Sequence, residues 1–181
     1  IIDGGELSPL TVEEQEIVLK ALQKSSREYQ LMFYLALFTG ARLQTICTLR
    51  IKYLLNREAD SYGFIRLPVG SGTGIDTKFQ KPMTLLIPNW LAQDIKIYIN
   101  SEQARQRRQK SNYGDSDENY VFLTKFGTPF YTSKVEQQEL IEKIKASDSF
   151  SLKLKLYEGE AVRSYLKVIL LPEIRLIDPK F

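Results

Sequence analysis

Residues 35–50 constrain the fold of this chain most, because they require two helices separated by a sharp break. An apolar helical run ends at Thr39-Gly40, and the first charged side chain after it is Arg42, at the start of the next helix. Backbone N–H groups at a helix start lack partners within the helix and carry a partial positive charge. Arginine adds a planar fork of donors that can bind two oxygens at once. The pattern favours a phosphate site at Arg42, whereas in an ordinary pair of helices the same side chain is only solvated.

Two short apolar runs, residues 63–69 and 83–87, predict a β-hairpin. The connection between them carries Lys78 and Lys81, so the hairpin presents lysines at its tip. Lysines at exposed turns are ordinary, and one sequence does not fix the register of a hairpin, so both lysines remain candidates. The Gly-Ser-Gly-Thr-Gly run at 70–74 lacks the Gly-Lys-Ser/Thr ending of a P-loop, which excludes that motif.

The rest of the chain has a mainly helical pattern. Thr11, with Glu14 three residues later, carries the capping-box signature of a helix start. A strand-like run at 119–131 contains a Gly-Thr-Pro turn, and a helix is expected to follow it. Helices are expected at about 12–23, 26–38, from 43, from 89 through 110, 133–146 and 159–171, the last closed by Pro172. Residues 1–8 are expected to be a loose leader, and 111–119 a polar loop without structure of its own.

Four basic residues lie at the end of the helix expected from residue 89, and they have two interpretations. They are Arg105, Arg107, Arg108 and Lys110. Basic side chains near a helix C-terminus offset the helix dipole and are usually solvated. The functional alternative is contact with the DNA backbone, because each neutralised phosphate releases counterions. A salt dependence of DNA binding distinguishes the two interpretations.

Taken in their order along the chain, these pieces resemble the tyrosine recombinases, the phage integrase family. The run Leu-Phe-Thr-Gly-Ala-Arg at 37–42, followed by Ile46 and Leu49-Arg50, resembles the first arginine box of that family. The strand pair bearing Lys78 comes second, and the run at 119–131 with its turn comes third. Agreement of three pieces in order is much rarer by chance than agreement of one short motif.

The resemblance implies a fold and a reaction. The fold is α+β, mainly α, the tyrosine recombinase catalytic-domain fold with a small antiparallel β-sheet, and residues 1–181 are the N-terminal portion of that domain. The reaction is site-specific recombination or integration of double-stranded DNA through a 3′-phosphotyrosine intermediate, with no metal or other cofactor and with a homo-tetramer assembled on the DNA. Arg42 would bind the scissile phosphate, and Lys78, or Lys81 as the alternative, would protonate the leaving 5′ oxygen.

Two features of the sequence depart from the family. Thr45 stands where the family carries Glu or Asp, and a hydroxyl adds no charge to support Arg42. The chain has no histidine and therefore no His-x-x-Arg box. Glu160-Ala-Val-Arg163 has the spacing of that box, but a glutamate cannot donate a hydrogen bond to phosphate at neutral pH and would repel it.

The tail at 171–181 resembles the stretch just before the missing box, so we expect a fragment that binds DNA without cutting it. None of its tyrosines is expected to be the nucleophile, and Tyr165 is expected to pack in an apolar helix. A catalytically silent DNA-binding or assembly module and a type IB topoisomerase-like enzyme are the alternatives. A later His-x-x-Arg and tyrosine in the parent sequence would distinguish the recombinase from the silent module.

Composition narrows the classes of function that the chain can have. A formal charge of +3 and a pI of about 8.8 permit nucleic-acid binding without requiring it. The absence of histidine excludes His-assisted Ser or Cys catalysis and His-containing metal sites. Cys47 is the only cysteine, so it forms no internal disulfide and is expected to be a small core residue. No apolar run reaches membrane-spanning length and no signal peptide is evident, so a cytoplasmic, nucleoid-associated protein is expected.

Overall fold

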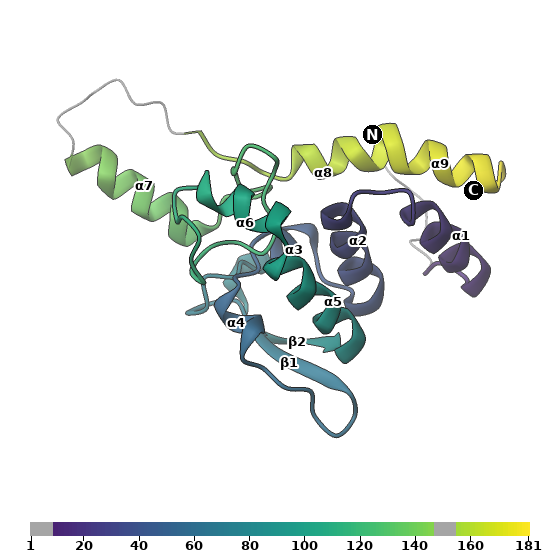
Figure 1. The fold of residues 1–181 in the computed structure, drawn as a ribbon, viewed down its shortest axis with the longest axis horizontal. Coiled ribbons are helices and arrows are strands. Elements are labelled where there is room, and N and C mark those ends of the chain that lie inside the picture. Colours follow the sequence, from purple (N-terminus) through teal and green to yellow (C-terminus); the bar gives the residue numbers. More distant parts are fainter. Residues whose placement is uncertain (1–8, 147–154) are drawn as a thin grey trace.

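The computed structural model describes residues 9–146 and 155–181 and is mainly helical with one two-stranded antiparallel sheet (Figure 1). Its elements are α1 (Val12–Leu22), α2 (Arg27–Thr39), α3 (Leu43–Cys47), α4 (Lys52–Leu55), β1 (Phe64–Val69), the 3₁₀ turn η1 (Lys78–Gln80), β2 (Met83–Pro88), α5 (Asn89–Asn100), α6 (Glu102–Gln109), α7 (Lys134–Ala146), α8 (Glu160–Tyr165), the π turn η2 (Leu166–Leu170) and α9 (Leu171–Ile177). The predicted α+β class is therefore confirmed, whereas the leader predicted at 1–8 lies outside the described residues.

Local signals at the first helices act as the sequence predicts. The Thr11 hydroxyl accepts the Glu14 backbone N–H, and the Glu14 carboxylate accepts the Thr11 N–H, which completes the capping box of α1. Gly40 ends α2 with a left-handed φ of 65°, and its N–H donates to the carbonyl of Ala36. Because the chain turns here, Arg42 becomes the N-cap residue of α3.

The sheet pairs β1 with β2 in the register Phe64↔Pro88 to Val69↔Met83, which confirms the predicted hairpin. Its buried side chains belong to one core cluster with those of α2 and α5, and these two helices also pack against each other. The core includes Leu31, Leu35, Ile65, Leu67, Ile87 and Ile95. The core thus holds the sheet against the helix that leads to Arg42.

Three predictions about the elements are wrong: the single helix from 89 through 110, the strand-like run at 119–131 and the end of the last helix at Pro172. Ser101 divides the helix expected from 89 through 110, because its extended backbone and a side chain that accepts the Ala104 N–H start a new helix, α6. The run at 119–131 forms isolated bridges, Arg50↔Tyr120 among them, in place of a strand.

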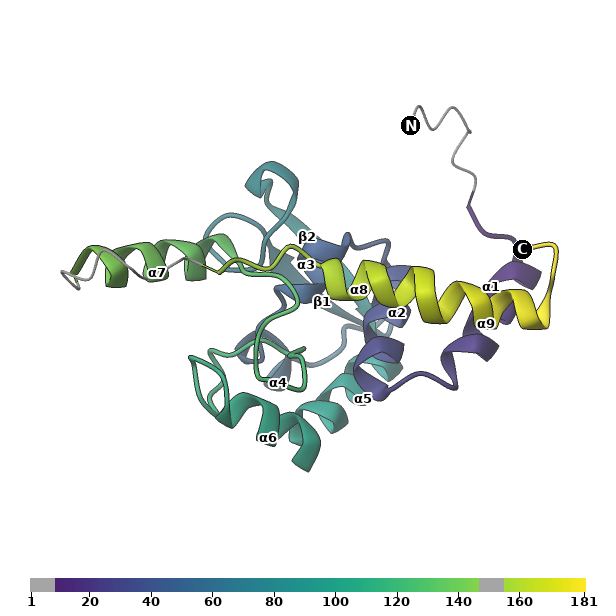
Figure 2. The ribbon, with the colours of Figure 1, turned by 90° about the horizontal axis from the view of Figure 1, so that it is seen from above.

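Pro172 does not close the last helix, because the π turn η2 precedes it and the helix continues to Ile177. The wider turn accommodates a residue that lacks an N–H. In Figures 1 and 2, α8 and α9 accordingly form one continuous rod, and α9 packs against α1. No helix in the described ranges is both long and apolar enough to cross a membrane.

Cys47 is fully buried in the core, as predicted, and burial raises the pKa of its thiol to about 12. The thiol of the unfolded chain ionises at about pH 8.5, so the unfolded state binds fewer protons above that pH. We therefore expect the free energy of unfolding to fall as pH rises from about 8.5 toward 12. Urea denaturation at about pH 7.5 and about pH 10 should show a smaller fall for Cys47→Ala than for the native chain. Equal falls in the free energy of unfolding for the two proteins would contradict the raised pKa of the buried Cys47 thiol.

Candidate functional site

Arg42, Lys78 and Lys81 line one hollow of about 180 Å³, which we call the Arg42 hollow. Arg42 comes from the start of α3, and the lysines come from the connection between β1 and β2, which projects from the body of the protein (Figure 2). Phe79 and Met83 also line it, and its lining contains no carboxylate. The fold thus brings the predicted catalytic residues and the alternative lysine to one cationic surface.

These three cations are available to an external anion. Arg42 is exposed, and no residue in the described parts of the chain forms an ion pair or hydrogen bond with its guanidinium. Lys78 and Lys81 are also exposed, and the Lys78 Nζ atom lies 5.1 Å from the centre of the Phe79 ring. Unpaired like charges around a concave surface raise the local positive potential, which favours binding of a phosphate.

Gly70 holds the base of the hairpin connection closed. Its φ is 102°, and a Cβ atom built there would lie 2.5 Å from the Lys81 carbonyl oxygen. The Ser71 N–H donates to the Gln80 carbonyl at 3.1 Å across the same narrow neck. Only glycine permits this close approach, which fixes Lys81 beside the strand ends.

Asp76 ties the connection to two helices and was missed by sequence reasoning. It is buried, and its carboxylate accepts from the side chains of Gln44 and Gln80 and from the backbone N–H of Lys134 at the start of α7. The Thr48 hydroxyl accepts the Asp76 N–H at 2.9 Å. A single carboxylate in a polar connection carries no signal of burial, because its partners are remote in sequence.

Thr45 is buried and lines the Arg42 hollow at the position where an acidic residue was expected from the family. A buried carboxylate that does contact α3 is Asp76 of the hairpin connection, through its hydrogen bond from the Gln44 side chain. Asp76 does not line the hollow, so its contact with α3 is made through Gln44.

Arg50 occupies a separate, internal polar cluster. Its guanidinium donates to the Glu118 carbonyl at 2.9 Å and to the Ser133 hydroxyl at 2.8 Å, and it stacks 3.8 Å from the centre of the Tyr120 ring. Burial raises the pKa of the Tyr120 hydroxyl, so it stays protonated and can donate to Glu136. Arg50 thus anchors the polar loop at 111–119 to the start of α7.

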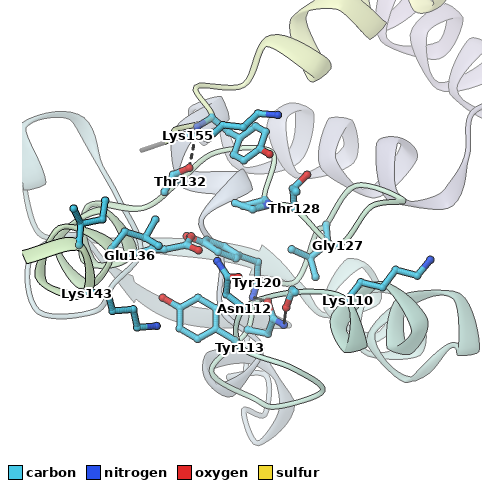
Figure 3. A pocket seen from close by; sticks show the side chains of 17 residues that line it. Lys110, Asn112, Tyr113, Tyr120, Gly127, Thr128, Thr132, Glu136, Lys143 and Lys155 are labelled. Atoms are coloured by element: carbon cyan, nitrogen blue, oxygen red, sulfur yellow. Dashed lines mark hydrogen bonds between the residues drawn. The ribbon is translucent and has the colours of Figure 1, made fainter. Parts of the chain in front are cut away.

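A larger cavity of about 540 Å³ lies beside this cluster (Figure 3). Figure 3 shows Tyr113, Tyr120 and Glu136 on its walls, with Lys110 and Lys155 among the labelled residues around it. Neither Arg42 nor Lys78 lines this cavity. It is therefore distinct from the predicted site.

The basic run of α6 divides into structural and surface residues. Arg107 is 8% exposed and pairs with Glu28 at 2.8 Å, while Arg108 is 5% exposed and pairs with Asp115 at 2.6 Å. The expected DNA-backbone contact is therefore wrong for Arg107 and Arg108, whose guanidinium groups form ion pairs within the protein. Arg105 and Lys110 are exposed, as a DNA contact would require, so for them the prediction stands.

The Glu160–Arg163 pair also lies outside the Arg42 hollow. Hydrogen bonds from backbone N–H groups lower the pKa of the Glu160 carboxyl, which keeps it anionic and unable to donate. The Arg163 guanidinium donates to the Glu158 carbonyl at 2.7 Å. Tyr165 stacks on Tyr29 with ring centres 3.9 Å apart, which confirms its expected packing role.

Comparisons with known proteins gave one kind of match. No family model matches the sequence, and no curated protein matches it. A solved structure of the Tn1549 transposon integrase in complex with a circular intermediate DNA is 19% identical with a TM-score of 0.46, covering 97% of this chain and 58% of that chain. A structure of the same integrase with transposon right end DNA is 18% identical with a TM-score of 0.44, covering 98% and 59%. The chain thus spans less than two thirds of the integrase chains that it matches.

The two kinds of arginine in α6 should respond differently to replacement. Arg107→Ala leaves the Glu28 carboxylate buried without its partner, so we expect the free energy of unfolding to fall by about 3–5 kcal/mol. Arg105→Ala removes the same charge from the surface and should change it by no more than about 0.5 kcal/mol. Urea denaturation measures both variants. A small effect of Arg107→Ala would contradict the buried ion pair between Arg107 and Glu28.

Proposed function

We propose that this chain is part of the DNA-cleaving and rejoining domain of a tyrosine recombinase-like enzyme, with the scissile phosphate bound in the Arg42 hollow. The observation that carries the proposal is the convergence of Arg42 and Lys78, from separate segments, on one hollow without any carboxylate in its lining. The same two residues are those that the sequence motifs selected.

The chemistry assigned to each residue follows from its charge and geometry. Arg42 would bind two non-bridging oxygens and stabilise the negative charge that grows on the pentacoordinate phosphate. Lys78 would donate a proton to the leaving 5′ oxygen as a general acid, with Lys81 as the alternative donor on the same wall. Arg105 and Lys110 would bind the DNA backbone away from the reacting phosphate.

The nucleophilic tyrosine and the second arginine of this reaction are not assigned to any residue of this chain. No tyrosine is among the residues that line the described Arg42 hollow, and the sequence contains no His-x-x-Arg box. We therefore assign the chain a phosphate-binding part of the site and assign the complete reaction, on a homo-tetramer bound to double-stranded DNA, to the parent protein. A silent DNA-binding module would use the same hollow without the reaction.

DNA binding should depend on the Arg42 hollow and on salt. We expect the chain to bind duplex DNA regardless of sequence, with an affinity that falls as salt rises, because bound phosphates release counterions. Arg42→Ala should weaken binding about tenfold at low salt and reduce the slope of log affinity against log salt by about 1. Fluorescence anisotropy of a labelled duplex at several salt concentrations measures both quantities.

Arg175→Ala is the matched control for this experiment, because Arg175 is an exposed arginine on α9, outside the lining of the hollow. It should leave the affinity nearly unchanged. Equal losses in the two variants would mean that binding depends on total charge, and absence of binding at low salt would refute the proposed function.

The chain alone should not become covalently attached to DNA. A phosphotyrosine ester requires a tyrosine beside the bound phosphate, and the Arg42 hollow has none in its lining. We therefore expect no covalent band on a denaturing gel after incubation with a labelled nicked duplex. A band that disappears in Arg42→Ala would show that one of the existing tyrosines reaches the phosphate, and the assignment of the nucleophile to the parent protein would be wrong.

A further inference from the structure

Phe79 and Gln80 have a backbone conformation that non-glycine residues rarely adopt. Their φ angles are 59° and 56°, and they are the two positive-φ residues other than glycine in the described parts of the chain. Left-handed conformations of this kind are unfavourable for residues with a Cβ atom and persist where the surrounding structure enforces them. Such residues cluster at functional sites, so the turn at Phe79 warrants a physical explanation.

Gln80 has an evident reason to be held in this conformation. Its side chain donates to the buried Asp76 carboxylate at 3.1 Å, and its carbonyl accepts the Ser71 N–H at 3.1 Å. These bonds close the neck of the hairpin connection. The conformation of Gln80 is therefore compensated by contacts within the fold.

The backbone of Phe79 is held by the same turn, because the Lys81 N–H donates to the Lys78 carbonyl at 3.3 Å around it, but its ring is not held by the fold. Its side chain is 86% exposed, so the folded chain gains little from burying it, and the ring contact that it makes is with the neighbouring Lys78. The turn thus holds a large aromatic ring out in solvent at the cost of an unfavourable backbone conformation. This turn closes the hairpin connection, whereas the exposed ring itself adds little to the stability of the fold.

The surroundings of Phe79 indicate which partner would cover the ring. Lys78 and Lys81 flank it in sequence, Arg42 lies across the same hollow, and Met83, 52% exposed, adds a second apolar group. Apolar side chains framed by unpaired cations match DNA, in which flat apolar base faces lie between rows of phosphates. A protein partner would instead have to bring several carboxylates around an apolar pocket.

We propose that Phe79 is a base-contacting wedge, which inserts its ring at a base step of duplex DNA while Lys78 and Lys81 hold the adjacent phosphates. The inference rests on the proposed function for the surface and adds that the hairpin turn unstacks bases there. The left-handed backbone presents the ring outward in advance, so little ordering is needed on binding.

The test compares Phe79→Ala with Phe126→Ala. Phe126 is a matched control, because it is 69% exposed beside Lys125, with the Lys125 Nζ atom 5.2 Å from its ring centre, yet it lies outside the Arg42 hollow and has an ordinary backbone conformation. The probe is a set of short duplexes that carry 2-aminopurine at successive positions, whose fluorescence rises when a neighbouring base unstacks. Binding is measured in parallel by anisotropy at two salt concentrations.

We expect the native chain and Phe126→Ala to raise the 2-aminopurine fluorescence at saturation, and Phe79→Ala to lose most of that rise. Phe79→Ala should also bind about tenfold more weakly, since a stacked base contributes on the order of that factor or more. Its salt dependence should stay unchanged, because the phosphate contacts of the lysines and Arg42 remain.

Phe79→Gly separates a DNA-contacting role from a structural one. Glycine adopts a left-handed conformation freely, so the melting temperature of the free variant should be unchanged or higher, while its fluorescence response should be lost as in Phe79→Ala. A lower melting temperature would show that the ring stabilises the fold, and it would overturn the inference.

The outcomes distinguish this inference from the proposed function. If Phe79→Ala keeps the full fluorescence response and affinity while Arg42→Ala loses affinity, the wedge is wrong and the proposed function stands. If the native chain binds no DNA at low salt, both are wrong. If the free native chain dimerises in light scattering and Phe79→Ala does not, the ring contacts a second copy of this chain and the wedge is again wrong.

Discussion

The need to supply hydrogen bonds to the buried Asp76 carboxylate is the constraint on which the arrangement of the site depends. A buried carboxylate is costly unless hydrogen bonds replace its water, and Asp76 forms no ion pair within the described ranges. Its carboxylate accepts three hydrogen bonds, from the side chains of Gln44 of α3 and Gln80 of the hairpin turn and from the first backbone N–H of α7. The helix dipole at the start of α7 also favours negative charge. All three donors must be present together, so one buried charge fixes α3 and the hairpin turn relative to each other. The cations of the Arg42 hollow are carried on these two segments.

Arginine has two separate uses in this chain, and location alone distinguishes them. Arg50, Arg107 and Arg108 are buried, and each finds its acceptors on another segment. Arg42 remains exposed in a hollow without carboxylates. A buried guanidinium is stable only where acceptors desolvate with it, whereas an exposed one needs none. The fold therefore provides its interior arginines with acceptors and leaves Arg42 exposed without one in the described residues.

The features that could be predicted from the sequence are those whose causes are local. The Thr11 capping box, the break at Gly40 and the hairpin each depend on residues within one or two turns or paired strands, and all three are present. The burial of Arg107 could not be foreseen, because its partner Glu28 lies 79 residues away. Asp76 was missed for the same reason. The break at Ser101 had a local signal, since serine is a common N-cap, but the polar run EQARQRRQ after it has no apolar period that would mark a separate helix.

The interior contacts of Gly70 and Asp76 also explain how the unfavourable cationic surface of the Arg42 hollow can persist. The exposed cations of the hollow repel one another and the backbone at Phe79 is strained, so contacts across the hollow do not hold it together. Gly70 and the bonds to Asp76 hold the same segments from the interior, where water does not compete. A polyanion bound as proposed would displace no internal ion pair at Arg42, and it would relieve the repulsion among the exposed cations. The residues that hold these segments and the cations that line the hollow are thus different sets, so we expect that the cations can be replaced one at a time without unfolding the chain.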